Sequence, residues 1–295
     1  MLSSADIQNL TVGEVTAKEQ EMLAHVHRLE ALLDPLEPLA LYRLCAMLTA
    51  SAKILEIGSY KGGSAVAMGH AVAHTDKELY CLDPWLAYLD NPDFEGIERE
   101  KIRDDFEVMR TFISNTEFIG ENLRMLRGKT QAFAGLLAGK GFDLIFIDGA
   151  HDYESVRADI KFAFSAIRSG GIICGHDYQI DAHGVLRAVN ELIVRVATIK
   201  GKGTVRDTSI WCCVVDNPTY EFAVTEISDL CNAGKLVEAQ EQAQTAYACY
   251  GTEEIQNYLT VIASARAQRE KSGQSYIPSC QSHSEERSVY PLCVD

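Results

Sequence analysis

Acidic and imidazole side chains follow two apolar runs of the sequence, at the points where strands are expected to end. Asp148 comes directly after the run at 142–147, and His176 and Asp177 follow the run at 170–175. Because adjacent parallel strands bring their carboxyl ends to one edge of a sheet, these three residues are expected to converge. Carboxylate oxygens suit Mg²⁺ or Ca²⁺, and an imidazole among them extends the choice to Mn²⁺, Fe²⁺ or Zn²⁺. The pattern predicts a metal site formed by Asp148, His176 and Asp177.

His151 lies three residues after Asp148 and is a candidate general base. A neutral imidazole, with an unperturbed pKa of ~6.5, accepts a proton near neutrality. Asp148 and His151 are therefore the predicted catalytic residues. The alternatives are that a strand-end aspartate caps the next helix, that a histidine fills a structural hydrogen bond, or that His176 or a lysine balances the acids without a metal.

A strand, a tight glycine turn and the start of a helix follow one another at residues 54–69. Gly58 and Gly63 allow the backbone to approach a ligand, and a helix that begins near Ser64 offers unpaired N–H groups. The turn lacks the GxGxxG spacing, and Glu56 in the strand would repel a pyrophosphate but attract the ammonium group of an amino acid. This favours S-adenosylmethionine over a dinucleotide. Tight packing alone is the alternative explanation of the glycines.

Asp83 ends the next apolar run, about 25 residues after the glycine turn, where doubly wound folds place an acid on ribose hydroxyls. Because Pro84 follows, the alternative role is a turn or the start of a helix. Trp85 is a candidate for the wall of an adenosine pocket, with simple packing as its alternative. Because Glu56 and Asp83 are two acids on neighbouring predicted strands, the ribose role is favoured for Asp83.

Short apolar runs, separated by amphipathic stretches, provide the strands on which these residues lie. Runs of this kind between helical patterns indicate a parallel sheet with crossover helices, and therefore an open, doubly wound α/β fold. The runs are residues 53–57, 78–82, 123–127, 142–147, 170–175 and 209–215.

Helical patterns precede and follow these runs. Thr16, with Glu19 three residues on, is a predicted helix cap, and apolar residues continue at helical spacing to Leu33. Near the other end, Gly234 and Gly251 are expected to separate about three helices, part of which resembles one tetratricopeptide-type unit. The predicted segments are N-terminal helices at 1–50, a catalytic domain at 51–217, a helical extension at 218–270 and a flexible tail at 271–295.

The composition excludes several classes of partner. The 295 residues include 27 Lys and Arg against 42 Asp and Glu, and the net charge of −15 argues against a nonspecific nucleic-acid surface. No window approaches the roughly 18 uninterrupted apolar residues of a membrane span, and no signal peptide is indicated. Nine cysteines without CxxC spacing suit reduced thiols. We expect a cytoplasmic protein with no nucleic-acid or membrane partner, and a homo-oligomer is left open.

Four motifs in this order make the chain resemble the class I S-adenosylmethionine-dependent methyltransferases. They are EIGSYKGGS at 56–64, LDPW at 82–85, FDLIFIDGAHDYESVRADI at 142–160 and GGIICGHDY at 170–178. More narrowly, the chain is similar to the family of macrocin-type sugar O-methyltransferases and cephalosporin hydroxylase-like proteins. The resemblance implies a seven-stranded, mostly parallel sheet, S-adenosylmethionine over the first two strand ends and often a divalent metal.

The resemblance also implies roles for individual residues. The implied cofactor-binding residues are Glu56, Gly58, Ser59, Gly63, Ser64, Asp83, Trp85, Gly128 and Asp148. Asp148 and Asp177 match the metal-binding acids, and His176 stands where relatives often place another acid. Many relatives have the form DGDHSY, whereas Ala150 replaces its middle acid here. Either His151 then serves as the base, or a metal ion, Mg²⁺ or Mn²⁺, acidifies the substrate hydroxyl.

The predicted function is therefore metal-assisted O-methylation of a hydroxylated small molecule or saccharide by S-adenosylmethionine. One alternative is a hydroxylase-like or other non-methylating enzyme on the same fold. Another is a noncatalytic interaction protein that docks through its helical extension. The acids Glu56, Asp83, Asp148 and Asp177 argue against this last alternative, because an interaction protein would not need them.

Overall fold

The computed structural model describes residues 3–29, 31–86, 105–194, 196 and 199–272. Within these residues the chain forms two compact units, the first ending at Asp216 and the second beginning at Asn217. The predicted tail at 271–295 lies outside the described residues from 273 onward. That catalysis belongs to the first unit stays a prediction.

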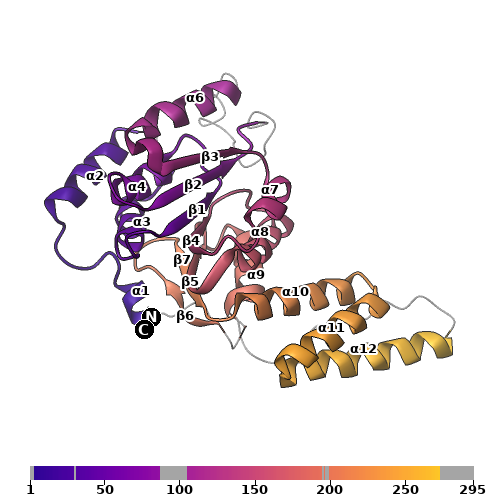
Figure 1. Ribbon diagram of the computed structural model, residues 1–295. Helices are drawn as coiled ribbons and strands as arrows, with labels where there is room; N and C mark the ends of the chain where they lie inside the picture. The colour runs from indigo at the N-terminus through magenta and orange to yellow at the C-terminus, as the bar shows by residue number, and fades with distance from the viewer. Residues whose placement is uncertain (1–2, 30, 87–104, 195, 197–198, 273–295) are drawn as a thin grey trace. The chain divides into compact units, whose positions relative to one another are not determined.

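A seven-stranded sheet forms the centre of the first unit, with the strand order β3-β2-β1-β4-β5-β7-β6 (Figure 1). The strands from β3 to β5 in this order pair in parallel, whereas β7 runs antiparallel to both of its neighbours. This architecture confirms the doubly wound, mostly parallel α/β fold. The strands are β1 (Lys53–Ile57), β2 (Glu78–Asp83), β3 (Leu123–Arg127), β4 (Phe142–Ile147), β5 (Ile167–Gly175), β6 (Lys200–Thr204) and β7 (Trp211–Val215).

The edge strand β6 is the strand that the apolar runs did not predict. Its sequence, KGKGT, has no large apolar residue, and only Gly203 within it is buried. An edge strand pairs on one side only, so the backbone ladder with β7 holds β6 without an apolar run. The central strands differ because helices cover both faces of the sheet, which requires apolar side chains on both.

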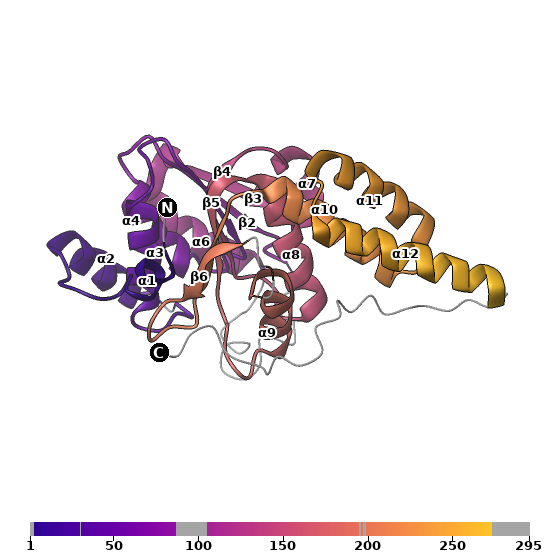
Figure 2. The same cartoon turned by 90° about the horizontal axis from the view of Figure 1, so that it is seen from below.

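Helices lie on both faces of the sheet, as expected for a doubly wound fold. Figures 1 and 2 show α2, α3 and α4 on one face and α7, α8 and α9 on the other. The helices of the first unit are α1 (Ser4–Gln8), α2 (Ala17–His27), α3 (Glu37–Ala46), α4 (Gly63–Val72), α6 (Asp105–Thr116), α7 (Thr130–Leu137), α8 (Tyr153–Ala166) and α9 (His183–Val189), with a short 3-10 helix at Glu117–Asn122 and a π-helical turn at Asn190–Val194.

The N-terminal helix α2 begins where the sequence predicts but ends earlier. Thr16 caps it, and the side chain of Glu19 accepts from the backbone N–H of Thr16 to complete a capping box. The helix ends at His27, although the helical spacing of apolar residues continues to Leu33. Leu29 and Ala31 pack against the core from the connection to α3, so tertiary packing overrides the local periodicity.

The second unit consists of the three helices α10 (Pro218–Asn232), α11 (Leu236–Tyr250) and α12 (Glu253–Ser272). Gly234 and Gly251 separate them, each with a positive φ, at the two glycines where the sequence predicts breaks. Their facing sides bury a small apolar core around Ile227, Ile255 and Ile262. This unit therefore has a core of its own.

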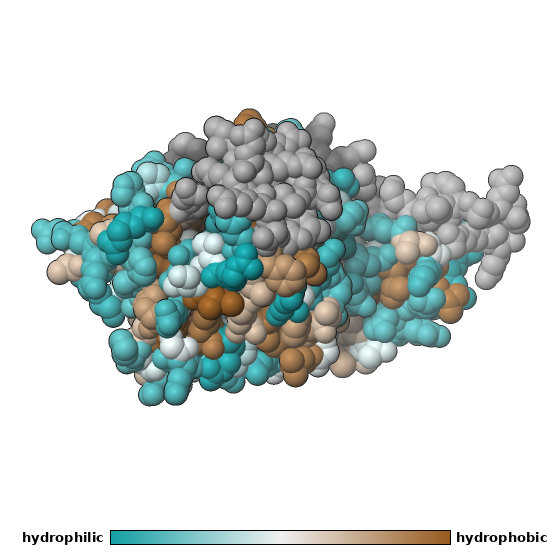
Figure 3. All heavy atoms as spheres, turned by 90° about the horizontal axis from the view of Figure 1, so that it is seen from above, coloured by the Kyte–Doolittle hydropathy of each residue, from teal (hydrophilic) through white to brown (hydrophobic). Residues whose placement is uncertain are grey.

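The described residues show a mixed surface and free thiols. In Figure 3, hydrophilic residues are interspersed with smaller hydrophobic areas on the face viewed from above. The described cysteines are free, and all of them except Cys249 are buried. None of the described helices combines the length and apolar character needed to cross a membrane.

Candidate active site

The glycine turn after β1 brings Gly58 against the backbone of Asp148. Gly58 has a φ of 87°, and a Cβ atom built on it would lie 2.0 Å from the carbonyl oxygen of Asp148. The backbone N–H of Asp148 donates to the carbonyl of Ile57 at 2.7 Å, so the ends of β1 and β4 are joined here. The glycine expected to admit a ligand thus admits a neighbouring strand end. It holds Asp148 beside the turn.

The remainder of the turn leads directly into α4. Gly62, with a φ of 90°, occupies the N-cap position in the left-handed conformation that glycine adopts most readily. A Cβ atom on Gly63 would lie 2.6 Å from the Cβ of Ala31, so the connection between α2 and α3 packs closely on the turn. The helix begins at Gly63, next to the predicted start at Ser64.

Glu56 is fully buried in β1, and its carboxyl group faces two serines of the turn. Ser64 Oγ donates to Oε1 at 2.5 Å, and Ser59 Oγ donates to Oε2. Burial raises the pKa of Glu56 to about 7, although the hydrogen bonds from the serines oppose this rise. An ammonium group nearby would favour the ionised form of a carboxyl whose pKa lies so close to neutrality.

We expect Glu56 to make the protein less stable as the pH rises from 4.5 to about 7. The unfolded chain loses this proton near pH 4.5, whereas the folded chain keeps it to about pH 7. The contribution of Glu56 to the free energy of unfolding is therefore full below the lower pKa and is lost as the pH rises through the higher one. The raised pKa corresponds to about 3 kcal/mol.

Urea unfolding of the wild type and of Glu56→Gln across this pH range measures the effect. The glutamine keeps one oxygen that can accept a hydrogen bond from a serine but does not titrate, so the variant should lose less stability with rising pH. The contribution of Asp159, whose pKa is also raised, to about 6, cancels in the comparison, and that of Asp148 cancels apart from its electrostatic interaction with Glu56. Equal slopes for the two proteins would contradict the role assigned to Glu56.

Asp83, at the end of β2, holds the glycine turn through its carboxylate. Oδ2 accepts from the backbone N–H groups of Ser59 and Tyr60, both at 2.9 Å, and Oδ1 accepts from the N–H of Trp85 at 2.6 Å. Tyr60 and Trp85 have φ values of 46° and 43°, which bulky residues rarely adopt. Asp83 therefore stabilises two strained residues. The ribose contact predicted for it stays a prediction beside this role.

Trp85 lies in the apolar core and is not among the residues that line the cavity described below. Its ring is fully buried, with a centroid 4.8 Å from that of Phe112, and its indole N–H donates to the carbonyl of Tyr60 at 2.9 Å. These contacts match the packing alternative, and the adenosine wall stays a prediction. Gly128, another predicted cofactor residue, donates its N–H to the carbonyl of Asp83 at 2.9 Å.

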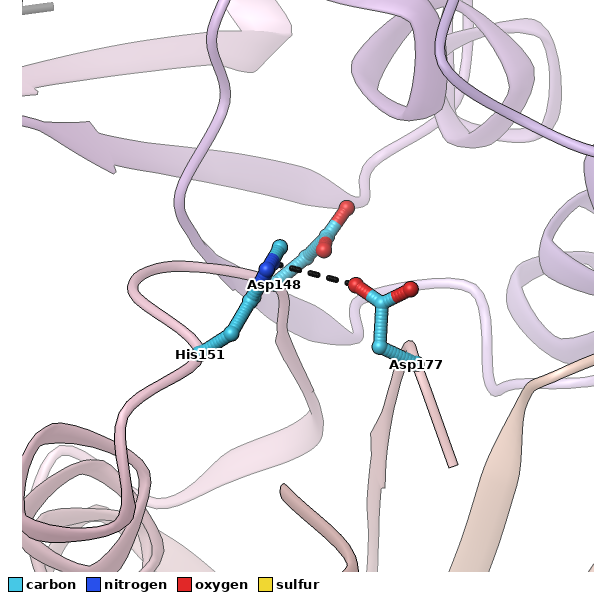
Figure 4. A group of neighbouring side chains, drawn as sticks. All are labelled: Asp148, His151 and Asp177. Atoms are coloured by element: carbon cyan, nitrogen blue, oxygen red, sulfur yellow. Dashed lines mark ion pairs between the residues drawn. The ribbon is translucent and has the colours of Figure 1, made fainter. Parts of the chain in front are cut away.

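Asp148, His151 and Asp177 meet at the carboxyl ends of β4 and β5, and their side chains point toward one another (Figure 4). One ligand atom from each residue lies within 4.8 Å of the other two. Nε2 of His151 is 3.0 Å from Oδ2 of Asp177. Two carboxylates and an imidazole so arranged could hold a divalent cation, or the imidazole could accept a proton while Asp177 orients it.

His176 lies beside this group, but both of its ring nitrogens face carboxylates. Nε2 is 2.7 Å from Oε2 of Glu37, and Nδ1 is 3.1 Å from Oδ2 of Asp177 and 3.6 Å from Oδ1 of Asp148. Burial lowers the pKa of His176, but the hydrogen bonds with Asp177 and Glu37 outweigh it and raise the pKa to about 11. A doubly protonated ring has no lone pair for a metal. Among the described residues, the group whose ligand atoms lie together is Asp148, His151 and Asp177, and the predicted ligand role of His176 stays a prediction.

The two aspartates respond differently to this environment. Burial raises the pKa of Asp148 to about 6; the charge of His176 opposes the rise, and the charge of Asp177 adds to it. Burial also acts to raise the pKa of Asp177, but the hydrogen bond and charge of His176, together with the charge of His151, hold it below its ordinary value. A cation bound here would favour the ionised form of both groups.

A cavity of about 600 Å³ joins the glycine turn to the acid cluster. The sequence motifs anticipated the part of its wall formed by the turn, Asp148, His151, His176 and Asp177. They did not include the part formed by the connection after α2. The part formed by α6 lies in the stretch 88–118, whose charge and length suggest a lid or acceptor loop, with a plain charged helix as the alternative. The lining residues of these two parts are Arg28, Leu29, Ala31, Leu32, Leu33, Glu107, Thr111 and Asn115.

Glu37 is a further residue of the site that the motifs did not indicate. It is the first residue of α3, fully buried, and in contact with His176. Burial acts to raise its pKa, but the hydrogen bond and charge of His176, together with the backbone hydrogen bonds from Ser209 and Asp34, outweigh burial and lower the pKa below its usual value. The only available signal is an acid at the start of the otherwise apolar stretch EPLALY.

Comparison with known families gives a match to this part of the chain. The model of a family described as a methyltransferase domain matches residues 55–178. The matched segment begins in β1 and ends just after β5, so it contains the glycine turn, Asp83 and the acid cluster. It excludes the N-terminal helices, the last two strands and the second unit.

Individual proteins similar to this chain are distant from it. An uncharacterized protein, y4gI, of Sinorhizobium fredii is 23% identical over 134 residues, which are 45% of this chain but only 14% of that protein.

Among solved structures, cofactor-bound Rv0187 from MTB is 18% identical, covers 72% of this chain and 95% of its own, and has a TM-score of 0.47. The O-methyltransferase TomG from Streptomyces achromogenes, solved in complex with SAM, is 19% identical, covers 72% of this chain and 96% of its own, and has a TM-score of 0.44. An O-methyltransferase from Bacillus cereus in complex with SAH is 16% identical, with coverages of 72% and 96% and a TM-score of 0.45.

Proposed function

We propose that this chain, whose residues 55–178 match a methyltransferase domain, is a class I S-adenosylmethionine-dependent methyltransferase that methylates a hydroxyl group of a small molecule or saccharide with the help of a divalent cation. The observation that carries the proposal is the cavity of about 600 Å³, which connects the glycine turn directly to Asp148, His151 and Asp177. A cofactor bound over the turn would therefore share one space with an acceptor bound at the acids.

The residues around the turn fit a cofactor with an amino acid moiety. The cavity has the size of typical small-ligand sites. Ser59 and Ser64 form part of its wall, and Glu56 lies behind them with a pKa raised to about 7. We infer that Glu56 and these serines favour the ammonium group of the methionine part. Asp83 would support the ribose side while it holds Ser59 and Tyr60 in place.

Asp148, His151 and Asp177 would hold the cation. Their donor set of two carboxylates and one imidazole suits Mn²⁺, which accepts nitrogen as well as oxygen ligands, and it also allows Mg²⁺. When bound, S-adenosylmethionine supplies the methyl group, and the cation lowers the pKa of the acceptor hydroxyl. His176, whose pKa is raised to about 11, would add a fixed positive charge beside the two aspartates.

A second mechanism on the same site is favoured by one contact. His151 Nε2 lies 3.0 Å from Asp177 Oδ2, and a carboxylate can orient an imidazole that acts as a general base. In that case His151 would take the hydroxyl proton while the walls of the cavity hold the acceptor in line with the methyl group. The two mechanisms differ in whether turnover requires a cation.

An assay with methyl-labelled S-adenosylmethionine tests the function and separates these mechanisms. We would offer catechols and monosaccharides with vicinal hydroxyls, because both present two oxygens to one cation. We expect labelled product with at least one acceptor class, loss of product in EDTA, and recovery on addition of Mn²⁺ or Mg²⁺. Full turnover by metal-free protein would contradict the requirement for a cation and would favour His151 as the general base. A protein that binds S-adenosylmethionine but labels no acceptor would contradict the proposed transfer.

A further inference from the structure

We propose that Glu37 is a positioning residue: it holds the ring of His176 against Asp148 and Asp177 and so sets the geometry of the cation site. The inference rests on the proposed function, because the cation site is part of it. It assigns to this site a residue from α3, outside the segment that matches the methyltransferase domain.

The contacts of Glu37 require a carboxylate. Oε1 accepts from the backbone N–H of Ser209 at 3.0 Å and from its hydroxyl at 2.9 Å. Oε2 accepts from the backbone N–H of Asp34 at 2.8 Å and faces Nε2 of His176 at 2.7 Å. Each partner is a donor, so an amide in place of the carboxylate would turn its own N–H₂ group toward a donor.

These contacts continue through His176 into the cation site. Nδ1 of His176 faces Oδ2 of Asp177 at 3.1 Å, and the same oxygen is 3.0 Å from Nε2 of His151. Nδ1 also lies 3.6 Å from Oδ1 of Asp148. Fixing the opposite nitrogen through Glu37 therefore fixes the ring that lies beside both aspartates. A rotated ring would release Asp177 from one of its two imidazole partners.

The position of Glu37 links separate parts of the first unit. Three of its four contacts tie the start of α3 to Ser209, just before β7, and to His176, just after β5. Helix α3 thereby determines where the carboxyl end of β5 presents Asp177. A residue with a purely structural role would not need to contact the imidazole that borders the cation site.

Binding of Mn²⁺ to the full chain, measured by electron paramagnetic resonance without any acceptor, tests the role of Glu37. We expect Glu37→Gln to weaken Mn²⁺ binding by about tenfold or more, the size of effect seen when supporting residues of metal sites are changed. Its affinity for S-adenosylmethionine, measured by calorimetry, should stay within about twofold. Tight Mn²⁺ binding by this variant would overturn the proposal.

Glu19→Gln is the matched control. Glu19 is also a buried acid of the N-terminal helices, but it pairs with Arg43 at 2.6 Å and completes the capping box of α2. The control should lose stability while it retains wild-type affinity for Mn²⁺. An equal loss of Mn²⁺ binding in this control would overturn the specific role of Glu37, because general loosening would then explain both variants.

A double-mutant cycle with His176→Asn shows whether Glu37 acts through the imidazole. If it does, the double variant should bind Mn²⁺ about as weakly as His176→Asn alone. Additive losses would overturn the proposed route. Should Glu37→Gln not fold, Glu37→Asp replaces it in every comparison, because it keeps both oxygens but shortens their reach; unchanged Mn²⁺ binding would then overturn the proposal.

Failure of this inference differs from failure of the proposed function. If the wild-type protein transfers methyl groups but binds no Mn²⁺, the proposed cation site is contradicted. The positioning role of Glu37 then fails as well. If Glu37→Gln binds Mn²⁺ as tightly as the wild type does, only the role of Glu37 is overturned, and the proposed methyl transfer stands.

Discussion

Replacement of Asp177 by Asn is expected to lower the rate of methyl transfer by about 10²-fold or more, the scale on which loss of an acid–base or cation-holding group acts. One oxygen of Asp177 contacts both His151, at 3.0 Å, and His176, at 3.1 Å. The asparagine amide is neutral, so the substitution removes the negative charge that faces both imidazoles. Because Asp177 lies outside the glycine turn, the affinity for S-adenosylmethionine should change by no more than about twofold. Steady-state kinetics and calorimetry measure the two effects.

Asp181→Asn provides the control for this prediction. Asp181 follows Asp177 on the same loop, but its side chain is exposed, and it should retain wild-type turnover. Excess Mn²⁺ adds a further distinction. If Asp177 holds the cation, raising the Mn²⁺ concentration should restore part of the lost rate. No restoration would favour the orientation of His151 as its role, and wild-type turnover by Asp177→Asn would contradict both.

Replacement of Asp83 by Ala is expected to destabilise the protein without ligand and to abolish detectable binding of S-adenosylmethionine. The carboxylate accepts from the N–H groups of Ser59, Tyr60 and Trp85, and each buried donor left unsatisfied costs about 1–3 kcal/mol. Tyr60 and Trp85 also have positive φ values, so they should relax once these bonds are lost. The glycine turn would then lose its shape. Thermal unfolding of the apo protein and calorimetry with the cofactor measure both effects.

The apo stability separates two roles of Asp83. A residue that only contacts ribose would weaken cofactor binding and leave thermal unfolding unchanged, which would contradict the turn-holding role. Asp76→Ala, at an exposed acid just before β2, is the control and should change neither quantity. The structure thus raises the expected effect of Asp83 above the loss of ribose hydrogen bonds that the sequence alone suggests.

Local chemistry made most of the fold predictable from the sequence. The strands β1 to β5 and β7 are short apolar runs, the cap at Thr16 depends on a residue three positions away, and Gly251 ends α11 through its own backbone freedom. These signals act over a few residues, so they can be recognised without knowledge of the remainder of the chain. Strand β6 could not be recognised in this way, because its partner β7 supplies what its own side chains do not.

The carboxyl edge of the sheet was also predictable, because parallel strands place their ends together whatever the side chains are. This placed Asp148, His151, His176 and Asp177 in one region. It could not assign their roles, since the sequence predicted His176 as a ligand, whereas the described group whose ligand atoms lie together contains His151.

The sequence by itself thus determined the sheet, the glycine turn and the set of residues at its edge. Only the tertiary structure decided which groups pair. The pKa of His176 is raised because Asp177 and Glu37, the latter 139 positions away and 2.7 Å from the ring, both hydrogen-bond to it. Gly58 is needed because Asp148 lies against it at the end of β4. Electrostatic and steric effects depend on distance in space, so residues remote in the sequence determine whether an imidazole here binds a proton or a metal.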